Sequence, residues 1–320
     1  MQTIDFLAMA WILILLILHS TFVNTTGHLP SDFDTQYPAP WHLQFISNRD
    51  PGHYTFPFRF DESAGEGIYV YVLDDGFDPY HPEFGPGQVE FGKTFAPKRC
   101  LPGVNHHGTA VASMVIDQYV GVVKKATVVD VQVGTEVEGC KRPWAFESAL
   151  LWTLLHIIEH DRLNRSVVNL SWNSDKTCKA IDFMLSRLYN HGIPVVASAG
   201  NNAHFASNYC PGNSSWVTTV GSMDPFWSRS PFSNIGGAVE IFAPRGHASV
   251  ADSMRVNHDA LREAHGTSFA APMVGGVIAY HFAMDGYLDP ESMRQLLKDS
   301  EPRTCSTIRR VLRSWCCITT

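Results

Sequence analysis

Residues 68–77 read IYVYVLDDGF, and this segment is the clearest indication of the fold class. It opens with β-branched, aromatic and aliphatic residues without polar alternation, which is typical of a strand covered on both faces. Similar short runs occur at residues 127–133, 166–171 and 193–197. Together these runs predict a parallel sheet that is buried on both sides.

Helical stretches lie between the predicted strands. Residues 144–161 are strongly apolar, and Pro143 stands at a position that suits the start of a helix. Residues 178–191 carry apolar side chains at helical spacing. The alternation predicts an α/β fold, a doubly wound and mostly parallel sheet with helices on both faces. In such folds, functional residues gather at the carboxyl ends of the strands.

The composition suits one large globular domain. The chain has 320 residues, of which 45% are hydrophobic, so it can bury a sizeable core after an N-terminal extension. Its formal net charge is −7 and its isoelectric point is about 6.1. Because nucleic-acid binding requires a basic face, we expect no nucleic-acid partner.

The N-terminus carries the apolar run FLAMAWILILLIL at residues 6–18. This run is shorter than the roughly 20 residues that a membrane span needs, but it suits a signal peptide. We assign residues 1–20 to a signal peptide or signal anchor and residues 21–38 to a short linker. We therefore expect secretion, without membrane attachment after cleavage. A signal-anchored membrane protein is the alternative, because no Lys or Arg precedes the run.

Cysteines and glycosylation sequons fit a secreted glycoprotein. No Cys-x-x-Cys pair occurs, so zinc and redox motifs have no support. An odd number of cysteines leaves at least one unpaired or bonded to another chain: Cys100, Cys140, Cys178, Cys210, Cys305, Cys316 and Cys317. Sequons begin at Asn24, Asn164, Asn169 and Asn213. We expect Asn169 to be buried in a strand and unmodified, and Asn213 to be the best acceptor.

Three residues with complementary chemistry stand at element ends. Asp74 closes a strand, His107 begins a helical run, and Ser268 lies in GTSFAAPMVGGVIAY, where small residues lead into an apolar helix. A serine hydroxyl needs a base to become a nucleophile, histidine can take and return its proton, and a carboxylate can hold the imidazole. Each residue alone could merely cap a turn or helix, but together they predict a catalytic triad.

Asn201 follows the strand-like run VVASAG and could supply a further catalytic contact. Its side-chain amide would donate to the oxyanion that forms in acyl transfer, beside the backbone N–H of Ser268. A turn role is the simpler interpretation of this residue alone. Its position after a strand favours the oxyanion role when it is considered with the triad.

Four segments resemble the signature blocks of the subtilases: VYVLDDGFDPYHPEF, NHHGTAVASMV, VVASAGNN and GTSFAAPMVGG. The order Asp, His, Ser is that of subtilisin. APWHLQFIS and RSPFSNIGGAVEIFAP are similar to proteinase K-like fungal enzymes. The resemblance implies a subtilisin-like catalytic domain at residues 39–300. It also implies a serine endopeptidase that acts through an acyl-enzyme on Ser268, cuts extended polypeptides, needs no cofactor and is a monomer.

The resemblance also implies a substrate site. Gly139 lies in the segment similar to the edge strand that pairs with an extended substrate. Glu240 stands where proteinase K-like enzymes place a calcium-binding Asp, so structural calcium is a candidate. We expect Cys178 and Cys210 to pair, because their loops should be neighbours at the specificity pocket. The residues that match the pocket are Ser171, Trp172, Asn173, Ala197, Ser198, Ala199 and Gly200.

Several departures from the family pattern leave alternatives open. Residues 21–38 are too few for a full prodomain, Trp172 and Asn173 replace smaller residues, and residues 301–320 form a tail of unknown role. One alternative is a catalytically silent subtilase relative that binds peptides or a partner. A kexin-like processing protease and an esterase-like hydrolase are two others. Asp74–Gly76 echoes kexins, but the chain after Ser268 is too short for their second domain.

Overall fold

The computed structural model describes residues 33–47, 56–96, 106–134, 143–175, 178–244, 248–251 and 261–299. By their contacts, Met1–Phe33 and Asp34–Thr320 form two units, and the description below concerns the second. The apolar run at residues 6–18 and the tail at residues 301–320 lie outside the described residues. No helix among the described residues is both long and apolar enough to cross a membrane.

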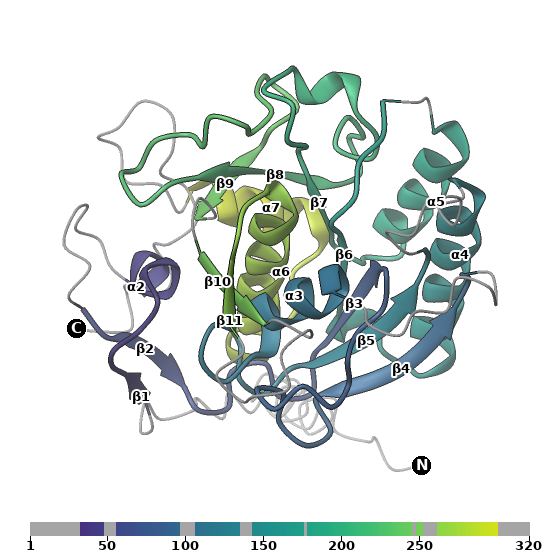
Figure 1. The fold of residues 1–320 in the computed structure, drawn as a ribbon. Helices are drawn as coiled ribbons and strands as arrows, with labels where there is room; N and C mark the ends of the chain where they lie inside the picture. Colours follow the sequence, from purple (N-terminus) through teal and green to yellow (C-terminus); the bar gives the residue numbers. More distant parts are fainter. Residues whose placement is uncertain are drawn as a thin grey trace, which may run out of the picture. The chain divides into compact units, whose positions relative to one another are not determined.

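A sheet of seven strands forms the centre of this unit (Figure 1). All its neighbouring strands pair in parallel. The doubly wound α/β fold predicted from the sequence is thereby confirmed. In spatial order the strands are β4 (Val89–Thr94), β5 (Thr127–Gln132), β3 (Tyr69–Asp74), β6 (Ser166–Leu170), β7 (Val195–Ser198), β8 (Thr218–Met223) and β9 (Ile241–Pro244).

Strand β3 shows why the central strands lack polar alternation. Val70 and Val72 belong to one hydrophobic core, whereas Tyr71 and Leu73 belong to a second core on the opposite face. All four side chains are fully buried. Because successive side chains of a strand point to opposite faces, a strand covered on both sides needs apolar residues at every position.

Helices cover both faces of the sheet. α3 (His106–Ile116) and α6 (Thr267–Met284) pack on the face of the first core, together with residues of α2 (Trp41–Ser47) and α7 (Pro290–Asp299). α4 (Pro143–Glu159) and α5 (Lys179–Asn190) pack on the face of the second core. Figure 1 shows α4 and α5 together on one side of the sheet, with α3 and α6 on the other.

Some strands were not predicted from the sequence. β4 reads VEFGKT, and its half-buried and exposed positions resemble a surface segment more than a core strand. β8 is buried along its whole length but reads TTVGSM, whose small polar residues give no hydrophobic signal. Two-stranded sheets join β1 (Phe33–Gln36) to β2 (Phe58–Asp61) and β10 (Ala248–Ala251) to β11 (Leu261–Ala264). Short 3-10 helices span Leu163–Arg165 and Ala206–Asn208.

The tight packing of α6 predicts unequal effects at two adjacent glycines. A Cβ on Gly276 would lie 2.9 Å from Cβ of Val122, whereas a Cβ on Gly275 would lie 3.4 Å from the nearest atom of Val196. Gly276→Ala should therefore lower the free energy of unfolding by about 1–3 kcal/mol, since the core is overpacked. Gly275→Ala, the matched control, should be neutral or raise it by up to ~1 kcal/mol. Urea unfolding measures both, and equal effects would contradict this packing.

Candidate active site

Asp74 and His107 form a close pair at the carboxyl end of β3. Nδ1 of His107 lies 2.7 Å from Oδ1 of Asp74. The Asp74 side chain is almost fully buried, while the His107 side chain is 28% exposed. Because a carboxylate only accepts hydrogen bonds, Nδ1 carries the proton and Nε2 is the basic nitrogen of the ring.

Ser268 lies in the first turn of α6 and is held by the chain that follows β6. Its Oγ donates to the carbonyl oxygen of Ser171 at 3.2 Å. In return, Oγ of Ser171 donates to the carbonyl oxygen of Ser268 at 2.5 Å. The fully buried Asn169 supports this exchange, because its Nδ2 donates to Oγ of Ser171 at 3.0 Å. Ser268 is thus fixed to the sheet by two reciprocal bonds.

Asn201 follows β7 and is tied to the start of α6. Its Oδ1 accepts hydrogen bonds from the backbone N–H and the hydroxyl of Thr267, both at 2.9 Å. The same hydroxyl accepts from the N–H of Gly200 at 3.1 Å. The amide nitrogen of Asn201 lies 3.2 Å from the position that a Cβ on Gly266 would take. The side chain is therefore oriented beside the residues that precede Ser268.

The topology brings these groups to one edge of the sheet. β3, β6 and β7 are neighbours in the sheet, and Asp74, Ser171 and Asn201 lie at or just after their carboxyl ends. The rings of His107 and Phe269 are 5.5 Å apart, so α3 and α6 meet next to Ser268. The arrangement collects a carboxylate–imidazole pair, a hydroxyl and an oriented amide at the place where α/β folds carry their sites.

The arrangement can be compared with known protein families. Residues 65–311 match the model of the Subtilase family, and this matched segment includes both Asp74 and Ser268. The chain belongs to the subtilase family. This subtilase also has the three-dimensional arrangement of a solved relative. A crystal structure of a cold-adapted subtilisin-like serine proteinase superposes with a TM-score of 0.72 and 27% identity, covering 86% of this chain and 97% of that one.

Curated fungal relatives are similar over most of the subtilase chain. A subtilisin-like protease of Coccidioides posadasii (strain C735) is 35% identical over 85% of this chain and 66% of its own length. The alkaline proteinase of Hapsidospora chrysogena is 32% identical over 77% of this chain and 59% of its own length. The chain thus spans about two thirds or less of the length of these relatives. The similarity to proteinase K-like fungal enzymes noted from the sequence is confirmed.

The residues predicted to form the substrate pocket lie at, or just after, the carboxyl ends of two adjacent strands, β6 and β7. β6 and β7 pair so that Leu170 is opposite Ala197, which brings the segments after them side by side. The side chain of Trp172 stacks on Phe146 of α4, with ring centroids 4.2 Å apart. The indole therefore packs on the face of the second core. Ala197, Ser198 and Ala199 are fully buried.

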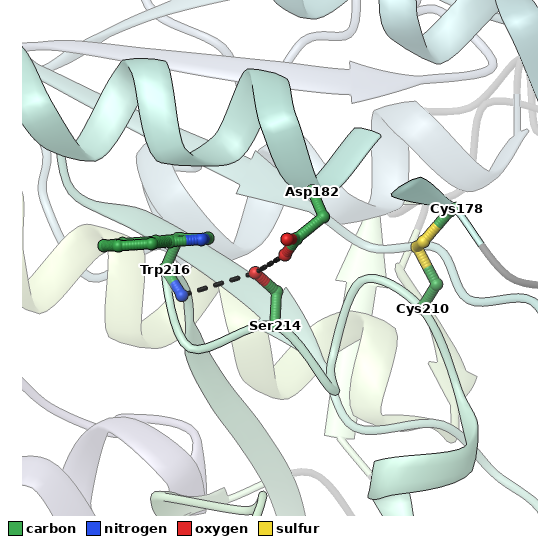
Figure 2. The surroundings of a disulfide bond; sticks show 5 residues. All are labelled: Cys178, Asp182, Cys210, Ser214 and Trp216. Atoms are coloured by element: carbon green, nitrogen blue, oxygen red, sulfur yellow. Dashed lines mark hydrogen bonds between the residues drawn. A yellow bond between two sulfur atoms is a disulfide. The ribbon is translucent and has the colours of Figure 1, made fainter. Parts of the chain in front are cut away.

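The predicted pairing of Cys178 with Cys210 is confirmed. Figure 2 shows the disulfide between the segment that precedes α5 and the loop that precedes β8. The backbones of Ser174 and Cys210 also exchange two hydrogen bonds, of 2.8 and 2.9 Å. Nearby, Oγ of Ser214 donates to Oδ1 of Asp182 at 2.5 Å, which joins the same loop to α5 (Figure 2). The cross-links fix the loop after Asn173, next to the predicted pocket.

Other sequence-based expectations have different outcomes. Gly139 lies outside the described residues. Asn169 is fully buried, as expected, whereas Asn213 is exposed. Glu240 does not fit a calcium site, because its carboxylate pairs with Arg294 at 3.2 Å and Lys298 at 3.6 Å. Within the described residues, no group of three His, Cys, Asp or Glu side chains could hold a metal ion.

Sequence reasoning missed two supporting residues. In the sequence, Asn169 stands out only as a buried sequon, and Thr267 only as a small residue before the helix. Their contacts with Ser171 and Asn201 join segments that are far apart in the chain. Burial was the available signal for Asn169, because a fully buried amide needs hydrogen-bond partners.

Ser171 should contribute to stability through its hydroxyl. Ser171→Ala would leave the buried Asn169 amide and the Ser268 carbonyl without this partner, so the free energy of unfolding should fall by about 1–3 kcal/mol. Ser186→Ala is the matched control, since that hydroxyl is exposed and bonds only within α5. Its effect should stay within about 0.5 kcal/mol. Equal denaturation midpoints for the two variants would contradict the bonding described.

Proposed function

We propose that this subtilase is a serine-type endopeptidase that hydrolyses peptide bonds of extended polypeptides through an acyl-enzyme on Ser268. The observation that carries the proposal is the 2.7 Å bond between His107 Nδ1 and Asp74 Oδ1 at the sheet edge where Ser268 is held. Names of the relatives, which include subtilisin-like protease and alkaline proteinase, support the same chemistry.

The proposed reaction begins at the hydroxyl of Ser268. His107 Nε2 removes the hydroxyl proton as Oγ attacks the carbonyl carbon, and the imidazolium then donates that proton to the leaving amine. Asp74 holds the ring in the required tautomer and stabilises its charged form. Water next attacks the acyl-enzyme with His107 again acting as the base, which releases the acid and regenerates Ser268.

The oxyanion of each tetrahedral intermediate requires donors. We assign this role to Asn201 Nδ2 and to the backbone N–H of Ser268. The bonds from Thr267 to Oδ1 of Asn201 support this role, because they orient the amide before the substrate arrives. A pre-oriented donor of this kind typically contributes about 3–4 kcal/mol to transition-state stabilisation.

The substrate would lie along the segments that follow β6 and β7. There residues 171–173 and 197–200 would form the walls of the specificity pocket, and Gly139 would be a further substrate-binding residue. Backbone pairing tolerates many side chains, so we propose broad specificity. The scheme requires no cofactor.

A secreted location accompanies the proposed activity. The apolar run at residues 6–18 suits a signal peptide, and the Cys178–Cys210 disulfide is typical of oxidising compartments. The exposed Asn213 is the proposed glycan acceptor. Polypeptides are the proposed partners of the monomer.

Hydrolysis of a denatured protein such as casein tests the proposal. The purified chain should release peptides, and Ser268→Ala should reduce kcat by about 10⁵–10⁶-fold, because nucleophile and base act as one unit. Stoichiometric peptide binding without cleavage would favour the silent relative, and preference for small esters over peptides would favour an esterase. Ser186→Ala, remote on α5, is the matched control and should retain full activity.

A further inference from the structure

The side chain of Asp75 links the two members of the Asp74–His107 pair. Its Oδ1 accepts a 2.6 Å hydrogen bond from the backbone N–H of Gly108, and its Oδ2 accepts a longer one, 3.4 Å, from the backbone N–H of His107. Its own N–H donates to Oδ1 of Asp74 at 2.8 Å, the same oxygen that faces the imidazole. The carboxylate therefore caps the first turn of α3, where the donors have no partner within the helix.

The close approach of α3 to this carboxylate depends on Gly108. A Cβ at this position would collide with the carbonyl oxygen of Gly76 and lie 2.9 Å from Oδ1 of Asp75. From the other side, Nε2 of Gln132 donates to the backbone oxygen of Asp75 at 2.9 Å. Asp75 is thus anchored to β5 while its side chain holds α3.

We propose that Asp75 is a positioning residue for His107. The Asp75 carboxylate fixes the first turn of α3 and, with Asp74, places a second negative charge beside the imidazole. The inference rests on the proposed catalytic role of His107, because the position and charge of the ring affect a reaction only if His107 is its base. Asp75 acts through His107 and is assigned no contact with substrate.

The surroundings of Asp75 make its charge dependent on pH near neutrality. Burial, and next the charge of Asp74, raise the pKa of Asp75 to about 7, against the opposing effects of the Gly108 bond and of His107. Asp130 of β5 also interacts with this group, and its pKa is raised to about 7, chiefly by burial. Since an ordinary histidine titrates in the same range and the charge of His107 acts on Asp75, the protonation of each group affects the other.

The sign of the coupling follows from the charges. Ionised Asp75 favours the imidazolium and raises the pKa of His107, whereas protonated Asp75 acts only as a hydrogen-bonding group. By reciprocity, protonated His107 favours ionised Asp75. Removing the charge should therefore lower the pKa of His107 and shift the acid limb of kcat/KM to lower pH.

NMR titration of the His107 ring tests this coupling without requiring activity. The parent is the full chain carrying Ser268→Ala, and the variants add Asp75→Asn or Asp75→Ser, which keep an acceptor for the helix but carry no charge. Either variant should lower the pKa of His107 by ~0.5–1 unit. Asp75→Ala should do the same and also speed amide exchange at Gly108, because the cap is lost.

Asp78→Asn is the matched control, because its Oδ1 accepts a bond from Tyr80 in its own loop and the net charge changes equally. It should shift the pKa of His107 by less than half as much. An unchanged His107 pKa in both Asp75→Asn and Asp75→Ser, or an equal shift in Asp78→Asn, would overturn the proposal. Absence of Ser268-dependent hydrolysis would instead overturn the proposed function and leave this titration readable.

Discussion

The hydrogen bond between Asp74 and His107 constrains the rest of the site. It requires a buried carboxylate at the end of a central strand and an imidazole at the first turn of a helix that packs against that strand. Burying a charged group is costly unless it is hydrogen-bonded. Asp74 meets this condition through the N–H of Asp75 and through His107, so it can stay charged while buried at the strand end.

The parallel sheet converts this local constraint into a complete site. Because all seven strands point the same way, the segments after β3, β6 and β7 emerge at one edge, and the helices α3 and α6 begin there. Ser171 then fixes Ser268 to the segment after β6, while Thr267 fixes Asn201 to α6. Each group that the proposed reaction uses is held by a neighbour from a different strand or helix, which limits its freedom before a substrate binds.

The sequence predicted the parts of the structure whose signal is local. Strand β3 can be predicted because both its faces are apolar. Asp74, His107 and Ser268 can be predicted because they stand at the ends of strands and helices. The supporting contacts were not predictable in this way. Asp75 reads as a turn residue before glycine, yet its carboxylate reaches α3, and Trp172 reads as an altered pocket residue, yet it stacks on Phe146 of α4. Both contacts depend on which distant segment of the chain packs against the residue, and the local sequence pattern does not predict this packing.

Active-site labelling with a fluorophosphonate probe, followed by peptide mapping, tests whether Ser268 is an activated nucleophile. Such a probe reacts with a serine whose hydroxyl is activated by a neighbouring base. We expect one adduct, on Ser268, that forms with the folded protein and is lost when His107 is replaced by alanine. Folded protein that takes up no label, or an adduct on a serine other than Ser268, would contradict it.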